Sequence, residues 1–143
     1  MKKLKVEEEA ILDVYMKEIR AILELASPVW HSGLTKAQAA EIERVQKIAL
    51  WIIQGNSKES YENRLEKLEI ERLSTRRQKL CLKFASKTVK SRHSEMFPKR
   101  DDTGYNTRQV FGPYCELRSF TNRCYNSPLN FLTRLLNENF MRN

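Results

Sequence analysis

Residues 35–55 read TKAQAAEIERVQKIALWIIQG and predict a complete α-helix with both of its ends marked. Thr35, followed three residues later by Gln38, has the form of a capping box, in which each side chain bonds to the other residue's backbone N–H. Gly55 suits the left-handed position that commonly follows a helix. Apolar residues spaced by three and four mark the face of this helix that should be buried. They are Ile42, Val45, Ala49, Ile52 and Ile53.

The flanking sequence predicts further helices at about residues 7–26, 58–68, 71–91 and 128–138. The pair Ser27-Pro28 should end the first of these, because the residue before a proline avoids the α region. A short connector is then expected at 29–34. The pair Ser127-Pro128 suits the start of the last helix. Two of these helices also have a predicted buried face. In the helix at 58–68 it holds Tyr61, Leu65 and Leu68, and in the helix at 71–91 it holds Leu73, Leu80, Phe84 and Thr88.

Residues 92–126 lack sustained periodicity and hold Pro98, Gly104, Gly112 and Pro113, which predicts an irregular segment. A short strand is expected within it at about 114–117. The fold class that follows is all-α or mainly α, an irregular bundle of about five helices with a long loop segment near 92–126. The length of 143 residues suits a single domain over 1–143, with a helical region at about 7–91.

The cysteines and the apolar runs indicate an intracellular protein, in the nucleus or the cytoplasm. Three cysteines are an odd number, and no apolar leader precedes them, so reduced thiols are the simpler interpretation. The longest unbroken apolar run, residues 48–53, is far shorter than the ~20 residues that a membrane span needs. No membrane partner is expected.

Positive charge is concentrated in residues 72–92, which hold 8 Lys and Arg and no Asp or Glu, within a chain of net charge +8. At ~100° per helical residue, six of these cations fall within an arc of about 80°. They are Arg72, Arg76, Lys79, Lys83, Lys87 and Lys90. Such a stripe can track a phosphate backbone, although a solvated helix face has the same pattern. Aromatic residues for base stacking could come from Tyr105, Phe111, Tyr114 and Tyr125, whose alternative role is to pin the loop segment to the core.

The sequence offers no catalytic or metal site, and no cofactor is expected. The chain has only three Asp, and the one pair, Asp101-Asp102, follows two cations in a predicted loop. A zinc site needs closely spaced ligands, whereas Cys115 and Cys124 have eight residues between them and both histidines lie far from them. Cys81 is expected to be a buried structural thiol.

Several blocks of the sequence resemble one family in the same order. The blocks are residues 15–35 (YMKEIRAILELASPVWHSGLT), 42–47 (IERVQK), 76–85 (RRQKLCLKFA), 123–129 (RCYNSPL) and 132–137 (LTRLLN). They resemble the region beyond the polymerase core in reverse transcriptases of non-LTR retrotransposons, especially Jockey-like elements. The resemblance implies a thumb-side and C-terminal region whose parent's endonuclease and polymerase domains would lie upstream of Met1, so no enzyme activity is expected here.

The leading hypothesis is therefore a non-catalytic fragment that binds RNA or DNA backbones non-specifically through the six cations. One alternative is a protein-interaction or structural module, in which the apolar faces of the first two helices dock a reverse-transcriptase core or a second copy of the chain. Another alternative is an enzyme. A transposon relic without function is the remaining one.

Overall fold

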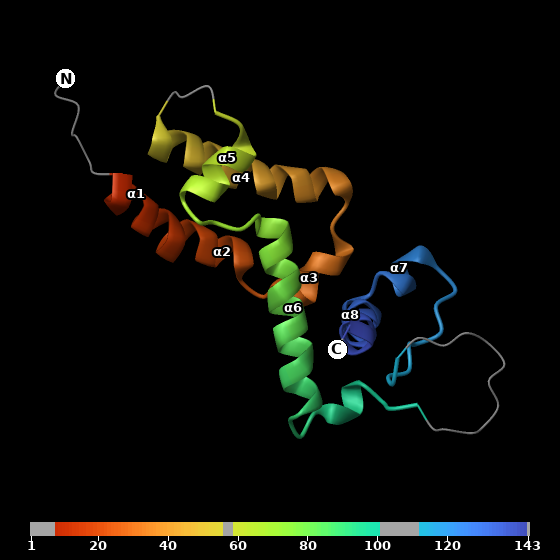
Figure 1. Ribbon diagram of the computed structural model, residues 1–143. Coiled ribbons are helices and arrows are strands. Elements are labelled where there is room, and N and C mark those ends of the chain that lie inside the picture. Colours follow the sequence, from red (N-terminus) through yellow and green to blue (C-terminus); the bar gives the residue numbers. More distant parts are fainter. Residues whose placement is uncertain (1–7, 56–58, 101–111, 143) are drawn as a thin grey trace. The chain divides into compact units, whose positions relative to one another are not determined.

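A computed structural model describes residues 8–55, 59–100 and 112–142, and it confirms the all-α class. The chain divides into two compact units (Figure 1). The first unit comprises residues 1–27 and 34–77, and the second comprises residues 28–33 and 78–143. Each unit has a hydrophobic core of its own. The single domain expected from the length stays a prediction, and the units are described in turn.

The first unit begins with one helical run in place of the uniform helix predicted at 7–26. It consists of α1 (Glu8–Val14), a π-helical turn η1 (Tyr15–Ile19) and α2 (Arg20–Glu24). This helical run ends before Ser27-Pro28, and Ala26 adopts a positive φ of 50°. Ser27-Pro28 then opens the short helix α3 (Ser27–Trp30), which a 3-10 turn η2 (His31–Gly33) follows. The connector expected at 29–34 is thus largely helical.

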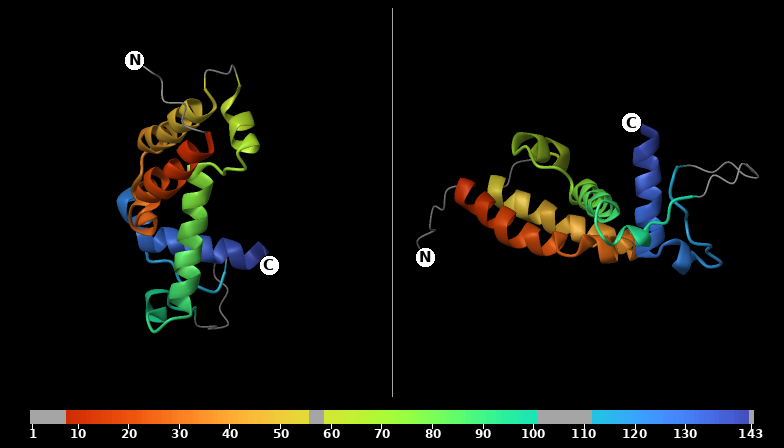
Figure 2. Two further views of the ribbon diagram at one scale, coloured as in Figure 1. Left: turned by 90° about the vertical axis from the view of Figure 1, so that its left-hand side faces the viewer. Right: turned by 90° about the horizontal axis from the view of Figure 1, so that it is seen from below.

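The helix predicted from residues 35–55 is confirmed as α4 (Lys36–Gln54). Its predicted buried face is partly wrong, because Val45 and Ile52 are exposed, whereas Ile53 is buried together with Gln46 and Leu50. The Gln38 N–H donates to Thr35 Oγ1 over 3.2 Å, and the Thr35 N–H donates to Gln38 Oε1 over 2.9 Å, so the capping box is complete. Gly55 follows with φ of 70°. Within the first unit, α1 and α4 lie side by side (Figure 2).

Helix α5 (Tyr61–Lys67) is capped by Ser60 and ends in a left-handed residue. Glu69 has φ of 53°, and the Ile70 N–H donates to the Leu65 carbonyl over 2.9 Å, which is the bond pattern of a Schellman motif. The predicted inner face of α5 is confirmed, since Leu65 is buried and Tyr61 and Leu68 pack against the same core. That core consists of Tyr15, Leu50, Ile53, Leu65 and Ile70.

Helix α6 (Leu73–Val89) belongs to the first unit up to Arg77 and to the second unit from Gln78. Its predicted inner stripe is partly wrong. Leu73 and Thr88 are buried as expected, but Phe84 is 44% exposed. The small side chains of Cys81 and Ala85 are buried instead. Cys81 is buried, as the sequence predicted.

The second unit continues with a 3-10 turn η3 (Ser94–Met96), the short helix α7 (Asn122–Tyr125) and the long helix α8 (Pro128–Arg142). α8 extends beyond the predicted end at about 138. The strand expected at 114–117 is wrong for the described residues, where a single antiparallel bridge joins Lys99 and Tyr114. The core of this unit consists of Cys81, Ala85, Phe97, Leu132 and Leu136.

Candidate nucleic-acid interface

The net positive charge of the chain belongs almost entirely to the second unit. Residues 28–33 and 78–143 hold 12 Lys and Arg against 5 Asp and Glu. Residues 1–27 and 34–77 hold 14 against 13 and are close to neutral. An anionic partner would therefore be attracted to the second unit, because a local excess of one charge raises the local concentration of the opposite one.

The two arginines of the predicted stripe lie in the first unit and form ion pairs there. Arg72 Nη2 lies 2.5 Å from Glu62 Oε1, and its guanidinium stands 5.9 Å from the centre of the Tyr61 ring. Arg76 pairs with Glu24, a carboxylate that also lies 3.5 Å from Arg20. Glu62 offsets the charge of Arg72, and Arg76 shares the Glu24 carboxylate with Arg20, so both arginines of the stripe are engaged within the first unit.

A hydrogen-bonded carboxylate anchors the start of α6. The Tyr61 hydroxyl donates to Glu43 Oε1 over 2.7 Å, and the Ser74 N–H donates to Glu43 Oε2 over 3.2 Å. Glu43 thereby caps a helix N-terminus, where a negative charge is favoured. Burial, and then the bond to Glu43, raise the pKa of the Tyr61 hydroxyl well above its usual value. This cluster joins the start of α6 to α4 and α5 within the first unit.

The four lysines of the stripe lie in the second unit and are all exposed. We call Lys79, Lys83, Lys87 and Lys90 the lysine row. At a rise of ~1.5 Å per residue the row extends over about 16 Å of α6. Within the part of the chain that the structure describes, Lys83, Lys87 and Lys90 form no ion pair. Their charges are therefore available to an external anion.

No protein-family model, curated protein or solved structure matches this chain.

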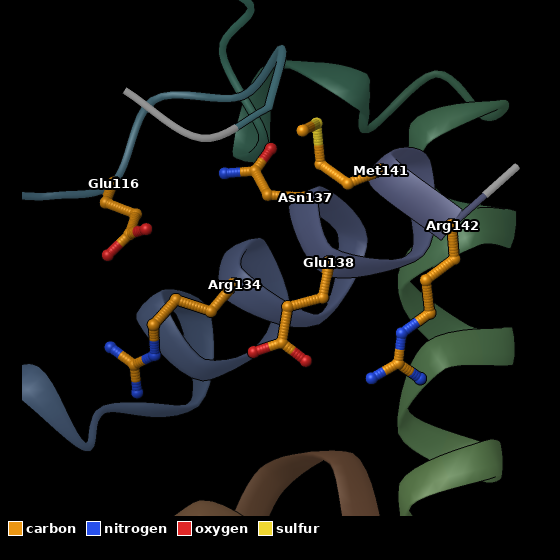
Figure 3. Close-up of a pocket in the computed structure, with 6 residues that line it drawn as sticks. All are labelled: Glu116, Arg134, Asn137, Glu138, Met141 and Arg142. Carbon is orange, nitrogen blue, oxygen red and sulfur yellow. The ribbon is translucent and has the colours of Figure 1, made fainter. Parts of the chain in front are cut away.

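A hollow of about 500 Å³ beside α8 also gathers charged groups within the second unit (Figure 3). Its lining combines both signs and consists of Glu116, Arg134, Asn137, Glu138, Met141 and Arg142. The guanidinium of Arg134 is already engaged, because it lies 3.9 Å from the centre of the Tyr125 ring and donates to the Tyr125 carbonyl over 2.9 Å. This mixed lining favours no single ligand charge, and we assign it no function.

Two buried asparagines hold the loop segment on α8, and neither was predicted from the sequence. Asn137 bonds to both backbone groups of Tyr114. Asn130 accepts from the Leu117 N–H over 2.9 Å and donates to the Cys124 carbonyl over 3.0 Å. The available signal was their spacing of seven residues, which places two poor helix formers on one face of a helix.

The other features considered from the sequence are a metal site, a membrane span, the Asp101-Asp102 pair and aromatic residues for base stacking. No group of three His, Cys, Asp or Glu that could hold a metal ion occurs among them. No helix among them is both long enough and apolar enough to cross a bilayer. Asp101, Asp102, Tyr105 and Phe111 lie outside the described residues. Tyr114 and Tyr125 both lie in the second unit, with the lysine row.

Proposed function

We propose that the chain binds RNA or DNA through the lysine row of its second unit, without strong sequence preference and without chemistry of its own. The observation that carries the proposal is the division of charge, in which the near-neutral first unit pairs its arginines and the second unit leaves Lys83, Lys87 and Lys90 unpaired among the described residues. Contacts between lysines and phosphates release counterions and require no base readout.

In this proposal the two arginines of the stripe have a structural role. Arg72 and Arg76 hold α6 against Glu62 and Glu24 of the first unit. The predicted set of six cations is thereby divided into two that position the helix and four that face the nucleic acid.

The proposed origin is the post-polymerase region of a non-LTR retrotransposon reverse transcriptase. The ordered sequence blocks support it, and a backbone-binding helix suits a region that helps to hold template RNA or target DNA. The origin and the binding activity are separate proposals, because the lysine row supports binding whatever the ancestry of the chain.

The test is a titration of the purified chain with labelled single-stranded RNA, single-stranded DNA and duplex DNA. Replacing Lys83, Lys87 and Lys90 together by Glu should abolish binding. The matched control replaces Lys17, Lys36 and Arg44 by Glu, which makes the same charge change at exposed positions of the first unit. Equal affinity of the lysine-row variant and the wild type would reject the proposal. Equal loss in both variants would show that only net charge matters.

A second candidate function is protein interaction through the first unit, and a specific observation favours it. A groove of about 190 Å³ runs between α1 with η1 and α4, and its lining is apolar. Val14 and Ile52, which line it, are 56% and 54% exposed. Large exposed apolar patches commonly mark interaction sites. The expected occupant is a second copy of the chain or a reverse-transcriptase core.

Sedimentation of Val14→Asp and Ile52→Asp variants distinguishes this candidate from nucleic-acid binding. If the groove mediates self-association, both variants should become monomeric while their affinity for nucleic acid stays unchanged. A wild-type chain that remains monomeric at high concentration would rule out self-association.

A further inference from the structure

A groove of about 630 Å³ opens in the second unit at the end of the lysine row. Helix α6 supplies one wall, the C-terminal half of α8 supplies the other, and Tyr114 comes from the loop segment. Its volume falls within the ~300–1,000 Å³ that is usual for small-molecule sites. We call it the Phe140 groove. Its lining is Ser86, Val89, Lys90, Tyr114, Leu136, Asn139 and Phe140.

Lys90 belongs both to the lysine row and to the Phe140 groove. It is the last member of the lysine row, and its side chain lines the Phe140 groove. A strand whose phosphates follow Lys83 and Lys87 along α6 would therefore bring its next nucleotide to the mouth of the groove. The lysine row and the Phe140 groove therefore adjoin at Lys90 within the second unit.

The chemistry of the groove suits a nucleobase. Phe140 is 62% exposed, so its ring is available to a ligand. Every base has a π-face that can stack on such a ring. The Asn139 amide and the Ser86 hydroxyl form no hydrogen bond with the described residues. Both groups are therefore available to hydrogen-bond with the polar edge of a base.

Tyr114, which forms part of the wall of the groove, is held in place by hydrogen bonds. The Asn137 side chain bonds to its backbone N–H and to its carbonyl, and the bridge to Lys99 fixes the same segment. A preorganised wall loses little conformational freedom when a ligand binds. The groove is thus a formed feature of the second unit.

Resting on the proposed function, we infer that the Phe140 groove binds an unpaired base and makes the chain prefer single-stranded RNA or DNA to duplex. The bases of a duplex are paired and stacked inside the helix, and extracting one costs a few kcal/mol. Duplex binding therefore uses the lysine row alone, whereas a single strand gains the base contact as well.

The test compares two labelled oligonucleotides of equal length, oligo-deoxythymidine and an abasic strand that has the same phosphates and no bases. The wild-type chain should bind the base-bearing strand about five-fold or more tightly, because stacking of one base on an aromatic ring contributes ~1–3 kcal/mol. Phe140→Ala should remove this difference while affinity for the abasic strand stays unchanged.

Two further variants complete the design. Phe140→Leu keeps an apolar side chain and guards against loss of folding, and it should also lose the preference. Phe120→Ala removes an aromatic ring that is 87% exposed in the same unit but does not line the groove, and it should keep the preference.

The outcomes separate this inference from the proposed function. Equal wild-type affinity for the two strands, or a preference that survives both Phe140 variants, overturns the inference and leaves phosphate binding intact. Loss of the preference in the Phe120→Ala variant would likewise overturn the inference. Absence of binding to either strand at low salt overturns the proposed function together with the inference.

Discussion

Asn137 on α8 bonds to both backbone groups of Tyr114, which lies 23 residues earlier in the chain. Its amide oxygen accepts from the Tyr114 N–H over 3.0 Å, and its amide nitrogen donates to the Tyr114 carbonyl over 3.1 Å. A single buried side chain thus substitutes for a neighbouring strand. Because Tyr114 lines the Phe140 groove, this pairing supports the fold and the proposed site together.

Asn137→Ala should lower the free energy of unfolding by about 2–4 kcal/mol, since it leaves two backbone groups without partners in a partly buried position. Urea denaturation measures the change. Asn139→Ala is the matched control two residues away on α8, and it should cost less than about 0.5 kcal/mol because the Asn139 side chain has no hydrogen bond among the described residues. Equal effects of the two variants would contradict the role assigned to Asn137.

Gly112→Ala should also destabilise the second unit. Gly112 has a positive φ of 87°, and a Cβ there would overlap the Asn137 side chain. We expect a loss of about 1–3 kcal/mol from strain and displaced packing. Gly33→Ala provides the comparison, because a Cβ at Gly33 meets no atom within 4 Å. Thermal melting should separate the two variants by several degrees, and coincident melting curves would refute this explanation.

Glu69→Gly should stabilise the first unit by about 0.5–1 kcal/mol. Glu69 occupies the left-handed C′ position after α5 with φ of 53°, where a Cβ is unfavourable and glycine is preferred. Chemical denaturation of Glu69→Gly beside Glu69→Ala isolates the backbone effect, because both variants remove the same carboxylate. A Gly variant no more stable than the Ala variant would exclude a backbone contribution at this position.

Tyr15→Phe should alter the stability of the first unit at alkaline pH. Burial raises the pKa of the Tyr15 hydroxyl from 10.0 to about 12, and nearby Glu43 and Glu24 act in the same direction. A raised pKa means that the folded state keeps its proton where the unfolded state loses it. The stability linked to this group is present below pH 10 and is lost as the pH rises from 10 to about 12.

At neutral pH, Tyr15→Phe should be neutral or slightly stabilising, because the buried Tyr15 hydroxyl makes no hydrogen bond among the described residues. Urea unfolding between pH 8 and pH 11.5 tests both parts of the prediction. The variant should lose less stability than the wild type above pH 10. Parallel pH profiles would show that Tyr15 does not titrate as proposed.

The features predicted correctly from the sequence are those that depend on neighbouring residues. The capping box of Thr35 and Gln38 and the C-terminal Gly55 involve contacts within a few residues, so their pattern is visible in the chain. The apolar period of α5 likewise placed Leu65 in the core. These local rules were sufficient for the helical class and for the limits of α4.

The features that the sequence did not reveal depend on contacts between distant segments. The side of α6 that is buried is decided by what packs against Cys81 and Ala85, so a periodic pattern that includes the larger Phe84 was misleading. The ion pair of Arg76 with Glu24 joins residues 52 positions apart, and a stripe drawn on an isolated helix cannot include it. The pairing of Asn137 with Tyr114 has the same long-range character.

The salt dependence of single-strand binding measures directly whether the lysine row contacts phosphates, and it should be compared between the wild type and the variant with Lys83, Lys87 and Lys90 replaced by Glu. Each phosphate contact on a single strand contributes about −0.7 to the slope of log K against log salt. If these three lysines contact phosphates, the variant should bind weakly with a slope less negative by about 2. A variant with the wild-type affinity and slope would show that the lysine row does not contact the nucleic acid.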